Sequence, residues 1–202
     1  MKTSLTWKES GIVTGAGGAL FMMACFGIGW SMAACTTWTT PVTVALAVVF
    51  ITCGVFFYVY AIWTMRALRA WRKAHAGEPV PDDVVAASKR FRRNFGILFG
   101  TELLLIAIAI IACNVADAPN YITPLCVLIM GAHFIPFAWA YKRRFDYAPG
   151  VVAMATGIVG IVAIAQGADF ARTTAMVSLV AAVCVIGYGF YDIWVIRKVT
   201  AK

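Results

Sequence analysis

Charged residues are scarce in this chain. Asp, Glu, Lys and Arg make up 13% of its 202 residues, whereas 62% are hydrophobic and the mean hydropathy is +0.83. Soluble domains have about 25% charged residues and about 45–50% apolar residues. An apolar excess of this size is larger than a soluble core can bury, so it excludes a water-soluble globular protein.

Catalytic and cofactor motifs are also missing. The sequence has no G-x-S-x-G, no H-E-x-x-H, no C-x-x-C and no cysteine/histidine metal cluster, so it lacks the patterns of common hydrolase, zinc and dithiol sites. Its two histidines are too few for two bis-histidine haems, and no lysine lies deep in an apolar run, where a retinal Schiff base needs one. We therefore expect a protein that is not an enzyme and binds no cofactor.

Six long apolar runs are present instead. They cover residues 11–35, 41–64, 95–115, 121–141, 149–167 and 173–196. About 20 helical residues cross ~30 Å of hydrocarbon, and lipid requires every backbone polar group to be paired within the spanning segment. The sequence therefore predicts an all-α membrane protein, a single domain over residues 1–202 with six transmembrane helices arranged as three hairpins.

Basic residues mark one side of the predicted bundle. Sixteen of the 17 lie before the first run, after the even-numbered runs or at the C-terminus, and only Arg172 lies on the other side. This positive-inside distribution predicts that both termini are cytoplasmic and that the protein lies in the inner (plasma) membrane. The net charge of +8 then indicates orientation and contact with anionic lipid headgroups, and we expect no nucleic-acid partner.

The longest predicted connection is a basic cytoplasmic loop, residues 66–94. Its first part carries basic residues at helical spacing, so the second span is expected to continue as a basic helix. A Gly- and Pro-containing break at 77–81 follows, and Asp82 or Asp83 is expected to cap a second short helix, 84–93. The loop is interpreted either as a solvated, headgroup-bound connector or as a docking or gating element.

Small residues predict where helices pack closely. Gly11/Gly15 and Gly96/Gly100 are G-x-x-x-G pairs, and Gly157/Gly160 and Gly187/Gly189 add small patches. Such residues let helix backbones approach each other in lipid. The sequence leaves open whether these seams lie within one chain, between copies in a homo-oligomer, or against a membrane partner subunit. The hairpins also share an opening glycine and a closing Trp followed by a basic residue, which indicates either a triplicated hairpin or the usual ending of a helix at the interface.

Glu102 is the most informative residue, because it is the only charge in the third run and intramembrane acids are costly unless they have a role or a partner. It lies ~10 Å from the cytoplasmic start of its span, and His133 lies ~12 Å from the cytoplasmic end of the next. The two are therefore predicted to be neighbours that hold a proton or a cation, or that only satisfy each other's burial. Asp192 is expected to join them or to pair with Arg197 or Lys198.

Pro136 follows His133 by three residues and removes a helical hydrogen bond, which predicts either a bend that opens a binding pocket or a packing kink. The segment Gly131-Ala132-His133-Phe134-Ile135-Pro136-Phe137-Ala138 has the pattern G-x-H-F-x-P-x-A. With the upstream segment that contains Glu102, it resembles small, uncharacterised bacterial integral membrane proteins. The resemblance implies a six-span protein without an assigned activity.

Three functions follow from these residues. The first is a small transporter or channel-like protein, proton-linked, with a polar site in the cytoplasmic half built on Glu102, His133, Asp192 and Pro136. The second is a non-catalytic membrane subunit or sensor that binds a partner protein or lipid. The third, an intramembrane enzyme with Glu102 and His133 as acid and base, lacks a nucleophile or metal set. A disulfide between Cys35 and Cys113, near the outer ends of their spans, is left open.

Overall fold

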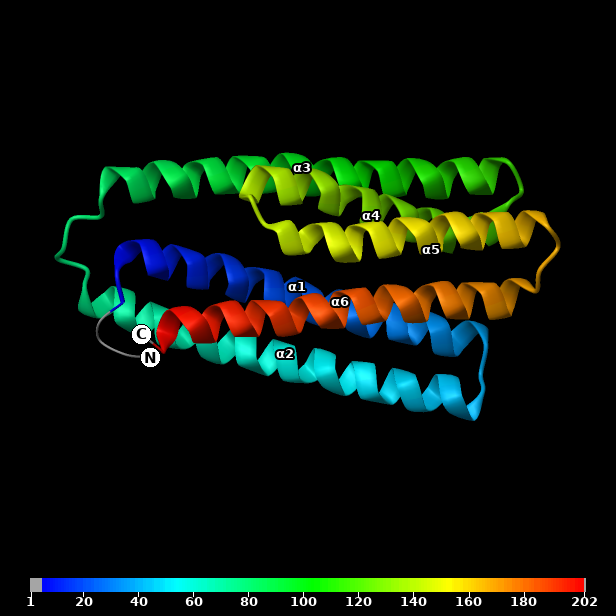
Figure 1. Ribbon diagram of the computed structural model, residues 1–202, viewed down its shortest axis with the longest axis horizontal. Coiled ribbons are helices and arrows are strands. Elements are labelled where there is room, and N and C mark those ends of the chain that lie inside the picture. The colour runs from blue at the N-terminus through cyan, green and yellow to red at the C-terminus, as the bar shows by residue number, and fades with distance from the viewer. Residues whose placement is uncertain (1–4, 202) are drawn as a thin grey trace.

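The computed structural model describes residues 5–201, and its regular structure over that range is helical throughout (Figure 1). The long helices are α1 (Trp7–Thr37), α2 (Pro41–Ala74), α3 (Asp82–Val115), α4 (Ile122–Tyr141), α5 (Tyr147–Ala165) and α6 (Phe170–Thr200), with 3-10 turns η1 (Pro119–Tyr121) and η2 (Arg144–Asp146). All six long helices are long and apolar enough to cross a bilayer. The protein is a multi-pass α-helical membrane protein, as the sequence predicted.

Side chains cap several of these helices. Thr6 and Glu9 form a capping box at the start of α1, and the side chains of Thr40 and Asp169 accept backbone hydrogen bonds at the starts of α2 and α6. Each cap satisfies backbone N–H groups that have no partner within the helix. Capping fixes where the apolar runs begin as helices.

The predicted break between α2 and α3 is present and begins two residues earlier than expected. As predicted, α2 continues past the apolar run as a basic helix, to Ala74, and only residues 75–81 separate it from α3. The predicted cap was wrong, because the N-cap of α3 is Pro81 and both Asp82 and Asp83 lie in the first helical turn. Their carboxylates lie at the N-terminus of α3, where they interact favourably with the positive end of the helix dipole. The second short helix is simply the beginning of the 34-residue α3.

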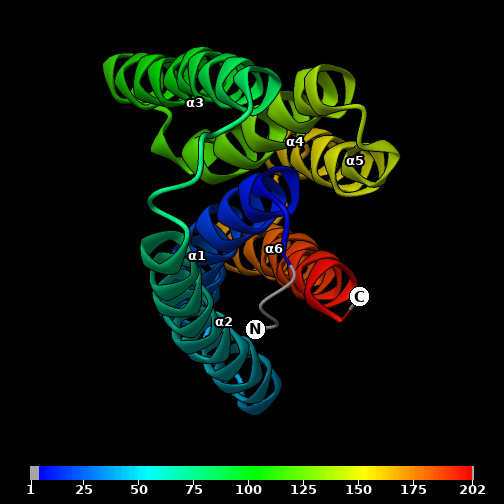
Figure 2. The ribbon, with the colours of Figure 1, turned by 90° about the vertical axis from the view of Figure 1, so that its left-hand side faces the viewer.

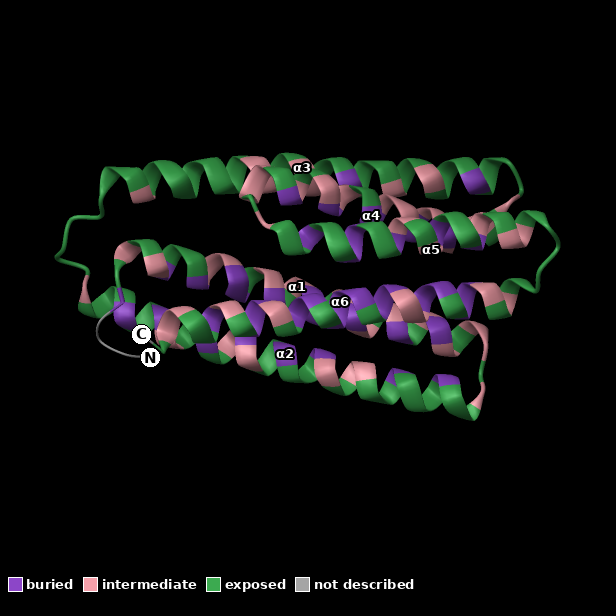
Figure 3. Cartoon of the chain, viewed as in Figure 1, coloured by how far each residue is buried: buried purple, intermediate pink, exposed green. Residues whose placement is uncertain are grey.

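The six helices form two groups that meet at α1 and α6. Viewed from the end in Figure 2, α3, α4 and α5 lie on one side, and α1, α6 and the outlying α2 on the other. Helix α1 packs on both α2 and α6, whereas α4 packs mainly on α5. Figure 3 shows α6 as largely buried and α3 as largely exposed, and only Glu102 and Cys113 of α3 are buried. The three hairpins are thus not equivalent, which argues against a symmetric triplicated arrangement.

Of the alternatives for the G-x-x-x-G pairs, the structure does not support close helix packing within a single chain. A methyl group added at Gly11, Gly96 or Gly100 would meet nothing within 4 Å, and one at Gly15 would meet only the ring of Phe91. Gly11, Gly96 and Gly100 are exposed, and Gly15 is half-buried in ordinary contact with Phe91 of α3. Their small size therefore plays no part in the packing of the monomer.

Among the glycine positions, the closest approach of two helix backbones lies between α4 and α5, where Gly157 and Gly160 form one of the small patches of the sequence. A Cβ atom at Gly157 would be 2.7 Å from the backbone nitrogen of Leu128 and from the carbonyl oxygen of Pro124, and one at Gly131 would be 2.5 Å from the backbone nitrogen of Met154. Only glycine permits such an approach, because any side chain would overlap the facing backbone. The α4–α5 pair therefore packs with its backbones almost in contact.

All six cysteines are free thiols. Cys35 and Cys113 are therefore not joined, and the Cys35 thiol instead donates to the backbone oxygen of Thr43 at 3.6 Å. The start of α1 and the end of α6 lie at the same end of the bundle as the α2–α3 connection (Figure 1). We call this end the terminal end, and the α4–α5 turn lies on the same side, set back from it.

Candidate functional site

Four helices, α1, α3, α4 and α6, line a partly open cavity of about 60 Å³. One water needs roughly 10–15 Å³, so the space has room for about four waters or a small solute. Six aromatic rings and three methionines contribute to its wall, and its polar side chains among the described residues are Glu102, His133 and Tyr188. The cavity is thus mainly apolar, with a few converging polar groups, as small-molecule sites usually are.

Glu102 and His133 face each other in this cavity. The Nδ1 atom of His133 lies 3.4 Å from Oε2 of Glu102, and Glu102 is only 7% exposed although it belongs to the most exposed helix. Depth counting on adjacent antiparallel helices predicted this pairing, and the structure confirms it. The acid of α3 and the imidazole of α4 therefore form one site.

The contact between the two groups is loose. A charge-assisted N–H···O hydrogen bond is usually about 2.7–2.9 Å long, so 3.4 Å leaves the carboxylate and the imidazole able to engage a third partner. Both side chains also line the cavity. The imidazole also has the backbone of Leu98 as a hydrogen-bond partner. The carboxylate, which faces the cavity, is therefore the group of the pair best placed to accept a proton or a small cation.

Aromatic side chains fix the position of α3 against α4. Phe95 packs edge-on to Phe137 with centroids 6.0 Å apart, and the ring of Phe137 lies 4.4 Å from that of His133. Nearer the terminal end, the hydroxyl of Tyr141 donates to the backbone oxygen of Phe91 at 3.3 Å. Since α3 has few other contacts, these aromatic contacts with α4 hold Glu102 in position opposite His133.

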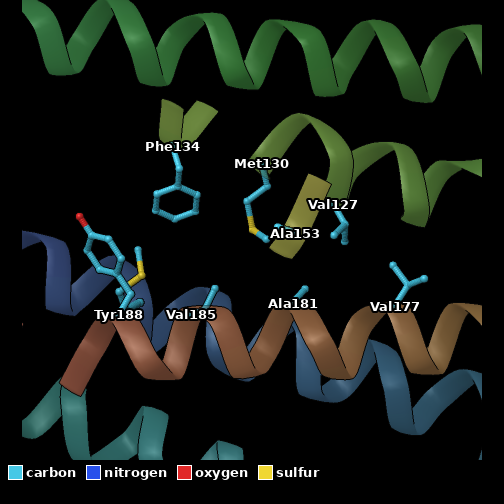
Figure 4. Packing of buried hydrophobic residues seen from close by; sticks show 9 residues of the cluster. Val127, Met130, Phe134, Ala153, Val177, Ala181, Val185 and Tyr188 are labelled. Atoms are coloured by element: carbon cyan, nitrogen blue, oxygen red, sulfur yellow. The ribbon is translucent and has the colours of Figure 1, made fainter. Parts of the chain in front are cut away.

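The opposite wall of the cavity is the core between α4 and α6. Figure 4 shows Met130 and Phe134 projecting from α4 toward Val185 and Tyr188 of α6. The rings of Phe134 and Tyr188 lie 5.4 Å apart. Tyr188 therefore borders the cavity with its ring.

Two predicted site residues lie elsewhere. Asp192 is fully buried but does not line the cavity, and its partner is Arg143 rather than Arg197 or Lys198. Pro136 is exposed within α4 and also lies outside the cavity wall. The predicted four-residue site therefore reduces to its Glu102–His133 pair.

Asp192 belongs to a second buried polar cluster at the turn between α4 and α5. Arg143 donates from Nη2 to Oδ1 of Asp192 at 3.2 Å, and its Nε lies 3.5 Å from Oδ1 of Asp146. The Tyr188 hydroxyl donates to the same Asp146 oxygen at 3.0 Å. The guanidinium carbon also lies 5.1 Å from the ring centroids of Tyr188 and Tyr191, which attract a cation.

Local backbone geometry directs Arg143 inward. Helix α4 ends at Lys142, which adopts the left-handed conformation with φ of 54°, a conformation that costs a lysine about 1–2 kcal/mol. The backbone of Arg143 then bonds back to Ala138. Burial disfavours the charge of Arg143, but its acidic and tyrosine neighbours outweigh burial and raise the pKa of Arg143 above its usual value. Arg143 is thus charged at every physiological pH.

Arg143 and Asp146 are site residues that the sequence pattern did not predict. Arg143 was interpreted only as one of the basic residues that mark orientation, and Asp146 was not singled out. A signal was available, because Asp146 is an acid in a short basic turn between two apolar runs. An acid in that position needs a cationic partner close by.

These features define a six-helix integral membrane protein with an acid–imidazole pair on a partly open cavity and a buried Arg–Asp cluster beside it. The family model of DUF7010, a family of unknown function, matches residues 87–189, and the chain belongs to this family. The matched range includes Glu102, His133, Arg143 and Asp146 and stops short of Asp192. No curated protein and no solved structure matches the chain.

Proposed function

We propose that the protein is a small, proton-linked transporter of the inner membrane, with both termini cytoplasmic, that moves a small cation through the Glu102–His133 cavity. The observation that carries the proposal is the loose 3.4 Å contact of these two groups within a cavity of about 60 Å³. A site in the cytoplasmic half, as depth counting predicts, would load from the cytoplasm. Membrane location alone supports many functions, whereas an acid that opens on an internal cavity is typical of ion and proton pathways.

The charge of the cavity favours a cation. Glu102 is its acid, and neither lysine nor arginine is among the described residues that line it. The faces of aromatic rings attract cations, and six such rings form part of the wall. A small cation would exchange its water shell for the carboxylate and the rings.

Protonation would couple to transport at the same pair. A protonated Glu102 has no charge with which to hold a cation, and His133 offers a second proton site at 3.4 Å. Proton and cation would therefore compete for one site. The expected sign is that cation uptake falls as the pH is lowered, because more of the Glu102 population is then neutral.

Flux into vesicles tests the proposal. The protein is reconstituted in phosphatidylcholine vesicles that contain a pH-sensitive dye, and tetramethylammonium, which cannot cross as a neutral base, is added outside. Wild-type protein should raise the internal pH as cations enter and protons leave, and Glu102→Gln should reduce this rate at least about tenfold. Glu78→Gln makes the same chemical change at an exposed position and should leave the rate unchanged.

Two results would contradict the proposal. One is a wild-type rate equal to that of protein-free vesicles, and the other is equal rates for Glu102→Gln and Glu78→Gln. The second result would leave the Glu102–His133 pair with a purely structural role.

A second candidate function, a membrane subunit or sensor, is favoured by one observation. Only two residues of α3, Glu102 and Cys113, are buried although the helix has 34 residues. A membrane partner would cover the remaining apolar face of α3 and the open Gly96 and Gly100. Purification in mild detergent separates the candidates, because a stoichiometric partner protein is expected only for the subunit.

A further inference from the structure

The Arg143 cluster contains one cation and two fully buried acids. Asp146 and Asp192 are both 0% exposed, and each directs its Oδ1 atom to the guanidinium of Arg143, at 3.5 Å and 3.2 Å. With both acids ionised, the cluster carries one net negative charge in the interior of a membrane protein. A buried charge without compensation is among the most unfavourable arrangements in a fold.

Both acids use the same edge of the guanidinium. The Nε–H group and the Nη2 atom form one side of its planar fork, the side that usually binds both oxygens of a single carboxylate. Here Nε faces Asp146 and Nη2 faces Asp192. Two carboxylate oxygens are therefore brought to adjacent positions on one small group, and the two negative charges lie close together.

The second oxygen of each acid has no hydrogen-bond partner. Within residues 5–201, Oδ2 of Asp146 and Oδ2 of Asp192 are buried and accept from no donor. A buried carboxylate oxygen without a donor costs free energy. The described titratable groups that act on the acids are Arg143 and Tyr188, and on Arg143 also Tyr191. None of these groups is placed on an Oδ2 atom.

We propose that Asp146 and Asp192 form a proton-binding site that holds one proton at neutral pH. Two carboxylates in one buried site do not both ionise, because each disfavours the charge of the other. Binding takes one proton from water, forms one O–H bond at an Oδ2 atom and brings the charge of the cluster to zero. A metal ion is a poorer occupant, since no group of three or more His, Cys, Asp or Glu residues in the described part of the chain is arranged to hold one.

The proton-binding site is separate from the cavity but touches it. The Arg143 side chain is 28% exposed, which gives protons access from water at the terminal end. Tyr188 places its hydroxyl on Asp146 and its ring on the cavity wall. The inference does not rest on the proposed transport, because proton binding is measured without any flux.

Infrared spectroscopy of the protein in phosphatidylcholine vesicles tests the site, because a protonated carboxyl group has its own C=O stretching band. The Glu102→Gln variant removes the signal of the other buried acid. At pH 7 this variant should retain one protonated carboxyl band, and incorporation of aspartate labelled with ¹³C in its side-chain carboxyl group should shift it. Adding Asp146→Asn or Asp192→Asn should abolish the band, because the remaining acid is then balanced by Arg143.

The matched control is Asp117→Asn in the same background. Asp117 is exposed and has φ of 52°, a conformation that asparagine tolerates, so this change should leave the band intact. The inference is overturned if no band at pH 7 shifts with labelled aspartate, or if the band survives both Asp146→Asn and Asp192→Asn. The labelling measurement needs no change at the site, so it decides the question even where an Asn variant does not fold.

Discussion

The contact between α4 and α5 gives the sharpest stability prediction. A Cβ atom at Gly157 would lie 2.7 Å from Leu128 N, Leu128 Cβ and Pro124 O, whereas ordinary contact begins at 3.4 Å. Gly157→Ala therefore requires the two helices to separate by about 0.7 Å. Two of the three atoms belong to the backbone, so no rotamer change relieves the overlap.

The cost follows from this overlap. Overpacking a tight contact typically costs about 1–3 kcal/mol, and alanine regains up to about 1 kcal/mol of helix propensity. Gly18→Ala is the matched control, because a methyl group there meets nothing within 4 Å and the propensity gain is the same. The free energies of unfolding of the two variants should thus differ by about 1–3 kcal/mol, with Gly157→Ala the less stable.

Thermal unfolding in detergent measures this difference. Cys113, Cys126 and Cys184 are buried free thiols, so a thiol-reactive fluorogenic dye reports unfolding without any added label. At about 2–4 °C per kcal/mol for chains of this size, Gly157→Ala should melt roughly 2–12 °C below Gly18→Ala. Gly160→Ala should be intermediate, since the atoms in its way belong to the side chains of Val177 and Pro124. Equal melting temperatures for Gly157→Ala and Gly18→Ala would refute the close backbone contact.

Two further predictions use the same unfolding assay. Arg143→Met leaves Asp146 and Asp192 without their cation and should lower the free energy of unfolding by about 3–5 kcal/mol. Its control, Arg144→Met at an exposed position, should change it by less than about 0.5 kcal/mol. Similar losses for both variants would contradict the role of Arg143 as the cation of the cluster. Phe57→Ala deletes a ring that is 0% exposed. It should lower the free energy of unfolding by less than the ~3–5 kcal/mol typical of soluble cores, because apolar side chains of a helix that has lost its packing are exposed to lipid and not to water. Phe56→Ala, 47% exposed, serves as its control, and an equal cost at the two positions would contradict the observed packing.

The number and type of elements were predictable because they depend on local properties of the chain. A run of about 20 apolar residues in lipid has only one favourable backbone conformation, so six runs became six helices. The Glu102–His133 pair was predictable for a related reason. Depth along a helix is proportional to residue number, and two residues at equal depth on adjacent antiparallel helices lie close together once their side chains face inward.

Other features depended on how each helix is rotated and which neighbour it meets. Gly96 and Gly157 look alike in sequence, but one lies on an open surface and the other against the α4 backbone. The same holds for Arg143, which resembles its neighbour Arg144 until the left-handed turn at Lys142 directs one inward and leaves the other exposed. Composition and spacing carry no information on these rotations, because they result from the simultaneous packing of all six helices. The local chemistry of the chain thus specifies six membrane helices and one acid–imidazole pair, while the packing alone assembles the cavity and the Arg143–Asp146–Asp192 cluster.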